Sequence, residues 1–145
     1  MISFVEEEVD AKLKERLLVK KWIKQVALSY GYKVGELCYI FCNDDKILET
    51  NRQYLQHDYY TDIITFDYVE NGILSGDMFI SVDTVQSNSV LFNTSYYDEL
   101  HRVIIHGVLH LCGLKDKQPA DEAQMRKAEE VALKMFSELK SEQSK

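Results

Sequence analysis

The chain has little of what marks secreted, membrane-spanning or multidomain proteins. Its 145 residues include one proline and six glycines. No apolar run in it approaches the roughly 18 to 20 residues that a membrane span needs. The first four residues lead into Glu6, Glu7 and Glu8, which is the wrong charge for a secretory leader. We therefore expect one domain, residues 1–145, with a single core, no membrane partner and a cytoplasmic location.

Cysteine is also scarce, with only Cys38, Cys42 and Cys112. An odd number of cysteines without a secretory signal favours reduced thiols over a disulfide framework. Cys38 and Cys42 resemble a redox or metal pair, but their segment is typical of a strand. Four residues of strand span about 13 Å, which is too far for a disulfide or a shared ion. We interpret both as core residues, and Cys112 as a small buried hydrophobe.

Positive charge is in the minority. The formal net charge is −7, which argues against a protein whose whole surface attracts polyanions. Lysines and an arginine nevertheless gather over residues 12–24, in the first predicted helix. These side chains form either a local basic face for nucleic acid or an ordinary solvated helix surface, and the sequence favours neither.

Hydrophobic periodicity predicts an α+β, or mixed α/β, domain, in which a small central sheet of three to four strands is covered by about five helices. Helices are predicted over residues 10–30, 45–55, 83–92, 97–112 and 119–139. Strands are predicted over residues 35–42, 61–69 and 73–82. The last two strands flank Asn71-Gly72, a turn dipeptide, and should form an antiparallel hairpin.

The most informative feature is a pair of histidines four residues apart, His106 and His110, in the strongly apolar metal-binding helix predicted near residues 97–112. This spacing places both imidazoles on one helix face, close enough to bind one ion. Chance spacing is the alternative, but buried imidazoles need partners and a metal ion supplies one. Gly113 can end the helix in the left-handed conformation, so that Asp116 turns back toward the rings. Such a site leaves the metal open to water.

Gly107 departs from the common metalloprotease signature. In the His-Glu-x-x-His motif a glutamate follows the first histidine and acts as general base, and here that position is glycine. A zinc ion with an open position can still lower the pKa of bound water to about 7 and polarise a carbonyl or phosphoryl oxygen. Hydrolysis therefore does not require that glutamate, and acid-base help would come from elsewhere.

Three blocks of the sequence carry a family pattern. Residues 58–66 read Asp-x-x-Thr-Asp-Ile-Ile-Thr-Phe, residues 76–81 read Gly-Asp-x-x-Ile-Ser, and residues 106–113 read His-Gly-x-Leu-His-Leu-x-Gly. The chain thereby resembles the YbeY family of metal-dependent single-strand endoribonucleases. The resemblance implies a Zn²⁺-dependent enzyme, with one ion per chain, that cleaves single-stranded RNA, matures the 3′ end of 16S ribosomal RNA and takes part in ribosome quality control. It also implies the small ribosomal subunit as a partner.

One departure from the family pattern concerns the third metal ligand. The family's third histidine stands ten residues after the first, where this chain has Asp116. A carboxylate is an acceptable zinc ligand, so we prefer His106, His110 and Asp116 as the metal ligands. An alternative alignment shifts the pattern by one residue and puts Lys117 in the histidine's place. That alignment leaves no third ligand, because an ammonium group cannot bind a metal without losing its proton.

A second departure concerns catalysis. The family has an arginine that is thought to assist the reaction at the position of Leu55. His57 and Arg52, which lies one helical turn before Leu55, are the candidate catalytic residues, because either could supply a charge or a proton. His57 is equally consistent with an ordinary surface side chain, and for Arg52 an ordinary helix-surface role is the favoured interpretation.

Several neighbouring polar residues have two interpretations. For Thr61 and Asp62 we favour bonds to nearby backbone over substrate contact. Glu99 and Arg102 either orient a ligand histidine or form an ordinary i,i+3 ion pair.

Two other classes of function stay open. The chain could be a non-catalytic ribosome-assembly or RNA-binding factor with a structural zinc, which the missing family arginine favours. It could instead be a metal-dependent hydrolase of a peptide or small molecule, which Gly107 argues against. The sequence indicates no oligomeric state.

Overall fold

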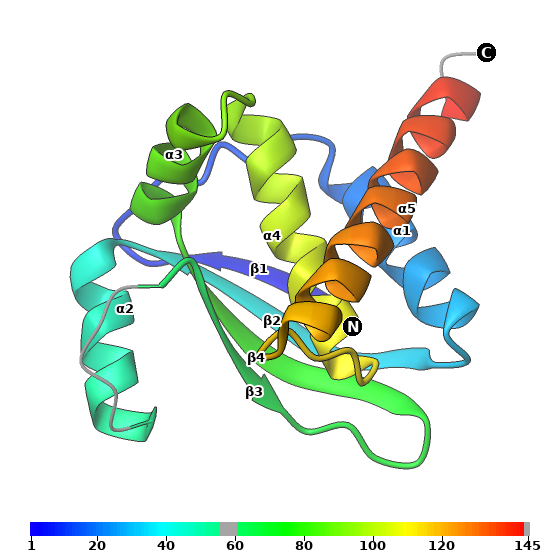
Figure 1. Cartoon of the computed structure of the whole chain (residues 1–145), viewed down its shortest axis with the longest axis horizontal. Coiled ribbons are helices and arrows are strands. Elements are labelled where there is room, and N and C mark those ends of the chain that lie inside the picture. Colours follow the sequence, from blue (N-terminus) through cyan, green and yellow to red (C-terminus); the bar gives the residue numbers. More distant parts are fainter. Residues whose placement is uncertain (56–60, 144–145) are drawn as a thin grey trace.

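The computed structural model describes residues 1–55 and 61–143. Its elements, in chain order, are β1 (Ile2–Glu6), α1 (Arg16–Ser29), β2 (Lys33–Cys42), α2 (Asp44–Thr50), the π-helical turn η1 (Asn51–Leu55), β3 (Ile63–Asp67), β4 (Ile73–Ser81), α3 (Val82–Leu91), α4 (Tyr96–Leu111) and α5 (Pro119–Gln143). The strands form one sheet in the order β1-β2-β4-β3, and α4 crosses one face of that sheet with α1 and α5 alongside (Figure 1). The α+β prediction, with three to four strands and about five helices, is confirmed.

The sheet is mixed. β1 pairs with β2 and β2 with β4 in parallel, whereas β3 and β4 form the predicted antiparallel hairpin. Asn71 and Gly72 both have positive φ, 52° and 76°, as the two-residue turn of a tight hairpin requires. The hairpin makes β3 the last strand of the sheet, next to the C-terminal half of α4.

The core lies between the sheet and the layer formed by α1, α4 and α5. Trp22 of α1 is fully buried and donates its indole N–H to the carbonyl oxygen of Ala132 in α5, at 2.7 Å. Tyr39 of β2 is also fully buried and donates its hydroxyl to the carbonyl oxygen of Ile104 in α4, at 3.0 Å. Because each buried polar group has a partner, the two aromatic side chains fix α5 to α1 and α4 to the sheet without a desolvation penalty.

Gly107 lets α4 approach the sheet closely. A Cβ atom at this position would overlap the sulfur of Met78 on β4 and would lie 3.0 Å from Cδ1 of Ile63 on β3. Any larger side chain would therefore have to displace both residues from a tightly packed layer. The close approach places the next helix face, which carries His106 and His110, beside the outer strand β3.

The N-terminal region departs from the sequence prediction. β1 was not predicted, and the first helix begins at Arg16, not near residue 10. Lys12 and Glu15 have left-handed φ angles of 54° and 55°, which no α-helix accommodates. Glu6 instead ties the segment down, since its carboxylate accepts from the Ala11 backbone N–H and from the Arg16 guanidinium, both at 2.8 Å.

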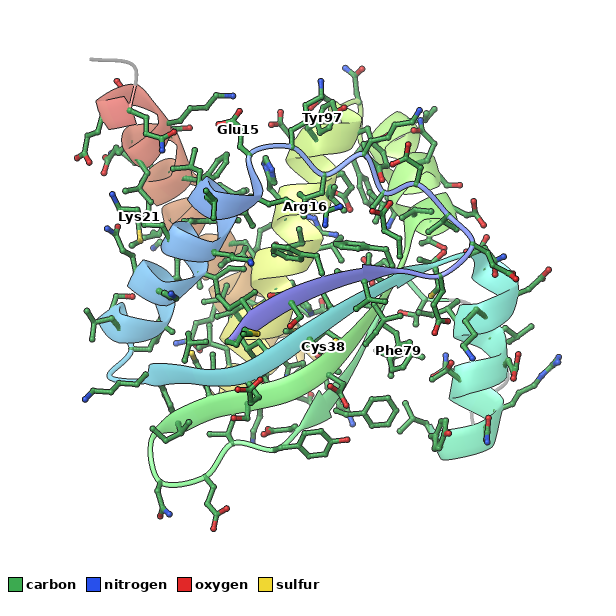
Figure 2. All side chains as sticks on the ribbon, turned by 180° about the vertical axis from the view of Figure 1, so that it is seen from behind. Glu15, Arg16, Lys21, Cys38, Phe79 and Tyr97 are labelled. Carbon is green, nitrogen blue, oxygen red and sulfur yellow. The ribbon has the colours of Figure 1, made fainter. Side chains whose placement is uncertain are left out.

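The three cysteines are free thiols. Cys42 is fully buried, as predicted, but Cys38 is only half-buried. Cys38 lies on the sheet face opposite α4, as Figure 2 shows from behind, so its prediction as a core residue is wrong. Cys112 is half-buried against the edge of the main core. None of the described helices is apolar over enough of its length to cross a bilayer.

Candidate functional site

Helix α4 carries His106 and His110 on one face, near its C-terminal end. Their ring centroids are 6.2 Å apart and the rings are nearly perpendicular, at 85°. The His106 side chain is 16% exposed, whereas His110 is exposed. The helix therefore presents one imidazole inside the protein and one at its surface.

Gly113 ends α4 and directs the following loop. Its φ is 101°, and its N–H donates to the carbonyl oxygen of His110 at 3.0 Å, while the N–H of Leu114 donates to that of Leu109 at 3.1 Å. This pair of bonds is the Schellman arrangement, with glycine at the left-handed position. The reversed chain brings Oδ2 of Asp116 to 3.2 Å from Nε2 of His106.

The other ring nitrogen of His106 contacts α5. Nδ1 lies 2.7 Å from Oε2 of Glu129, a residue that is only 5% exposed. A carboxylate can only accept a hydrogen bond, so Nδ1 donates to Glu129. In the neutral ring Nε2 then keeps its lone pair, facing Asp116.

Arg102, one turn before His106, joins the same group of side chains. Its Nε and Nη2 donate to the two carboxylate oxygens of Glu99 at 2.9 and 2.7 Å. Nη1 lies 3.3 and 3.4 Å from the two oxygens of Glu129, and Nη2 lies 3.4 Å from Oδ2 of Asp62. Three carboxylates thus surround one guanidinium, and we call Glu99, Arg102, Glu129 and Asp62 the carboxylate cluster.

The electrostatics follow from this arrangement. Burial of His106 disfavours its charged form, but the hydrogen bond to Glu129 and the charges of Glu129, Asp62 and Asp116 outweigh burial, so the pKa of His106 is raised. The hydrogen bonds that Arg102 donates to Glu99 raise the pKa of Arg102 as well, against the effect of burial. The environment of His106 therefore favours positive charge.

A pocket of about 290 Å³ opens beside the two histidines. It lies between η1, β3 and the α4–α5 loop, and its lining residues are Asn51, Leu55, Thr61, Asp62, Ile63, Ile64, Thr65, His106, His110, Asp116 and Lys117. The lining therefore combines two carboxylates, two imidazoles and the ammonium group of Lys117, which is exposed.

Of the predicted catalytic residues, Arg52 lies exposed on η1 and is not among the residues that line the pocket. His57, together with Asp58 of the first family block, lies outside the described residues. Leu55 does line the pocket. Thr61 donates to the carbonyl oxygen of Ile63 at 3.5 Å, a local backbone bond of the kind predicted for it.

The donor set suits a divalent cation in part. Among the residues that the structure describes, no three His, Cys, Asp or Glu side chains are gathered as a ready-made metal site. His106 Nε2 and Asp116 Oδ2 are 3.2 Å apart, however, and two ligands of one tetrahedral zinc ion lie about 3.3 Å apart. In the neutral ring with Nδ1 bonded to Glu129, Nε2 has no proton to lose, and the neighbouring carboxylates outnumber the cations. Burial raises the pKa of the Cys112 thiol to about 11, which makes it a poor ligand.

Sequence reasoning missed Glu129 as part of this site. One signal could have found it. Glu129 follows Met125 by four residues and precedes Ala132 and Phe136 by three and seven, so it interrupts the buried stripe of α5. A glutamate on an apolar helix stripe needs a partner inside the protein.

Comparisons with known proteins agree with the fold and with the sequence blocks. The family model described as Endoribonuclease YbeY matches residues 2–137. An endoribonuclease YbeY of Phocaeicola vulgatus is 60% identical over 140 residues, which cover 94% of this chain and 99% of that protein. One of Parabacteroides distasonis is 54% identical over 137 residues, with coverages of 94% and 96%. A solution structure of a Thermotoga maritima protein matches with a TM-score of 0.70 and 26% identity, over 98% of this chain and 93% of that one. The chain therefore belongs to the endoribonuclease YbeY family.

Proposed function

We propose that this protein is a metal-dependent endoribonuclease that cleaves single-stranded RNA at the pocket between η1, β3 and the C-terminal end of α4. The observation that carries the proposal is the arrangement of His106, whose Nδ1 is engaged by Glu129 while Nε2 faces Asp116 at the pocket wall. Membership of the endoribonuclease YbeY family supports RNA as the substrate.

His106, His110 and Asp116 would hold one Zn²⁺. When bound there, the ion would polarise a phosphoryl oxygen and lower the pKa of water. The chain's own residues prepare the site. Asp116 and the carboxylate cluster supply negative charge that favours a cation, and Lys117 at the rim attracts a phosphate group. His110 is exposed, and its ring, with its centroid 6.2 Å from that of His106, would have to turn toward His106 to bind the same ion.

The YbeY resemblance places the family's arginine at the position of Leu55. Here the pocket therefore has the leucine side chain among its lining residues where the family would have the arginine. The leucine presents an apolar surface to the ribose or base, and phosphate recognition falls to Lys117 and to the candidates Arg52 and His57. With a net charge of −7, the protein holds RNA locally, and binding should weaken with salt over only a few phosphates.

The proposed biological substrate is ribosomal RNA, chiefly the 3′ end of the small-subunit species. The small ribosomal subunit is then the partner, the cytoplasm is the location, and ribosome quality control follows from cutting defective RNA. Resemblance to the YbeY family is the support for this finer assignment.

A peptidase function is disfavoured by Gly107. The general base of the zincin motif would stand at this position, where a Cβ atom would overlap Met78 and crowd Ile63. A glutamate there would have to displace the side chains of Met78 and Ile63 from their present positions.

The test compares single-stranded RNA, duplex RNA and casein as substrates of Zn²⁺-loaded protein. We expect cleavage of single-stranded RNA only, abolished by chelation and by the double variant His106→Ala/His110→Ala, which controls for contaminating nuclease. Binding of RNA without cleavage would instead support the non-catalytic assembly factor. The chemical groups at the ends of the RNA products distinguish the possible mechanisms, because a 2′,3′-cyclic phosphate would exclude direct attack of water on phosphorus.

The metal ligands have a separate test. Elemental analysis of unchelated protein should give one zinc per chain, and Asp116→Ala should lower both content and affinity. Full metal content and affinity in Asp116→Ala would remove Asp116 from the ligand set. Protein that neither contains a metal nor takes one up would contradict the proposed function.

A further inference from the structure

We infer that Glu129 is a positioning residue that keeps the proton of His106 on Nδ1 and so reserves Nε2 for the metal ion, and that Arg102 holds Glu129 in place for this task. The metal part of the inference rests on the proposed function. The part that concerns the proton of His106 does not, and the two are tested separately below.

Glu129 contacts His106 directly. Oε2 of Glu129 lies 2.7 Å from His106 Nδ1, and the carboxylate comes from α5, 23 residues further along the chain. Nδ1 must be the donor, because the carboxylate has no proton to give at neutral pH. A metal-binding histidine commonly donates its second ring nitrogen to a carboxylate, which fixes the tautomer and the ring orientation.

The carboxylate of Glu129 is held in place by Arg102. Glu129 is 5% exposed, and Arg102 Nη1 lies 3.3 and 3.4 Å from its two carboxylate oxygens. The guanidinium is itself held by Glu99, a residue 2% exposed, through two parallel hydrogen bonds of 2.9 and 2.7 Å. Such a two-pronged pair allows little rotation, so Glu129 meets a rigid cation.

Arg102 also contacts one residue of the pocket lining, Asp62. Nη2 also lies 3.4 Å from Oδ2 of Asp62, which lines the pocket just before β3. One side chain of α4 therefore contacts α5 behind His106 and the wall of the pocket beside it.

The charge balance argues that this cluster does more than stabilise the fold. Glu99, Glu129 and Asp62 carry three negative charges around the single positive charge of Arg102. A buried ion pair is weak evidence for stability, because desolvation offsets its attraction. The carboxylates therefore outnumber the guanidinium, and this excess of negative charge is costly for an empty site and favourable for one that binds a cation.

The experiment uses the full chain and three variants, Glu129→Ala, Glu129→Gln and the control Glu130→Ala. Glu130 is the next residue of α5 and is exposed, so its loss changes the same helix and the same net charge without touching His106. Nitrogen-15 NMR of the metal-free protein, at a pH that keeps the ring neutral, reports which ring nitrogen of His106 carries the proton. Competition with a chelator measures the affinity for Zn²⁺ alone.

In the wild-type protein and in Glu130→Ala we expect the Nδ1–H tautomer. In Glu129→Ala the proton should move to Nε2 in most molecules, and Zn²⁺ affinity should fall about 10- to 100-fold. Glu129→Gln keeps a carbonyl oxygen as acceptor, so it should retain the Nδ1–H tautomer and lose less affinity. A purely structural role would not move the tautomer or be rescued by glutamine.

The inference is overturned if Glu129→Ala keeps the wild-type tautomer, or if its Zn²⁺ affinity equals that of Glu130→Ala. If Glu129→Ala does not fold, the tautomer and affinity of Glu129→Gln decide, since an Nε2–H ring in that variant also contradicts the inference. Wild-type protein that binds no Zn²⁺ would defeat the proposed function and the metal part of the inference, whereas the tautomer comparison would still stand or fall by itself.

Discussion

Two histidines of α4, His101 and His106, occupy opposite environments within one helix. The His101 ring packs against Trp22 and Phe136, with ring centroids 5.9 and 4.5 Å away. His106 faces carboxylates, with Glu129 and Asp116 at its two nitrogens. Burial lowers the pKa of His101, and the carboxylates raise that of His106. Five residues turn an α-helix by about 140°, so one side chain enters the aromatic core and the other the pocket.

Helix α5 makes the difference between them. It supplies Phe136 to His101 and Glu129 to His106, seven residues or about two turns apart on the same helix face. The role of each histidine therefore depends mainly on the residue of α5 that contacts it. An apolar partner makes a histidine part of the core, and a carboxylate prepares it for a proton or a metal ion.

The largest expected effect separates the two histidines by activity. His106→Ala should lower the rate of RNA cleavage about a thousandfold, because the several kcal/mol that a Lewis acid contributes are lost. His101→Phe should keep the wild-type rate, because a phenyl ring retains the contacts with Trp22 and Phe136. Single-turnover cleavage of a labelled single-stranded RNA measures both. Equal rates in the two variants would contradict the assignment of His106 to the reactive site and of His101 to the core.

The next effect concerns stability around His106. Arg102→Met should lower the free energy of unfolding by about 3–5 kcal/mol, because it leaves the buried carboxylates of Glu99 and Glu129 without their cation. Arg126→Met, an exposed arginine of α5, is the matched control and should change stability by about 0.5 kcal/mol or less. Urea denaturation of metal-free protein measures both. An Arg102→Met midpoint equal to that of the control would show that the cluster is not stabilising.

The sequence predicts the histidine face of α4 because that face depends only on local spacing. The four-residue separation, the apolar surroundings and Gly113 all act within one helix and its cap. The partners of His106 depend on tertiary packing. Glu129 lies in a helix of mixed charge, and only its position on the buried stripe of α5 distinguishes it from the exposed Glu130.

The difference between local signals and tertiary packing also explains which parts of the fold prediction were wrong. The β3–β4 hairpin was predictable, since its strands and its turn are contiguous in sequence. β1 is five residues long, continues into a run of glutamates, and is paired only through β2, 35 residues away in the register Ile2 to Leu37. Nothing local marks such a parallel edge strand.

The pH dependence of stability should have opposite signs for the two histidines in metal-free protein. Because the folded pKa of His101 is lowered, its favourable contribution is complete above the unfolded value of about 6.5 and is lost as pH falls below it. Because that of His106 is raised, its contribution is complete below about 6.5 and is lost as pH rises through the folded pKa. Each slope is at most about 1.4 kcal/mol per pH unit.

Urea denaturation between pH 5 and 8, with chelator present, measures these slopes. Relative to wild type, His101→Phe should gain stability on the acid side, and His106→Phe should lose its dependence on the alkaline side. If both variants moved the same side of the profile, the two environments would not be opposite.

The smallest expected effect concerns the loop after α4, which brings Asp116 to His106 and does not contact His101. Gly113→Ala places a Cβ on a residue with φ of 101° but meets no atom within 4 Å, so the cost is backbone strain alone, about 1–2 kcal/mol. The strain should loosen the turn that brings Asp116 to His106, and Zn²⁺ affinity should fall. NMR signals of His101, Trp22 and Phe136 should stay in place, because those rings lie on the other side of α4. A shift of the aromatic signals as large as that of His106 would show that the two faces of the helix are coupled through its C-terminal cap.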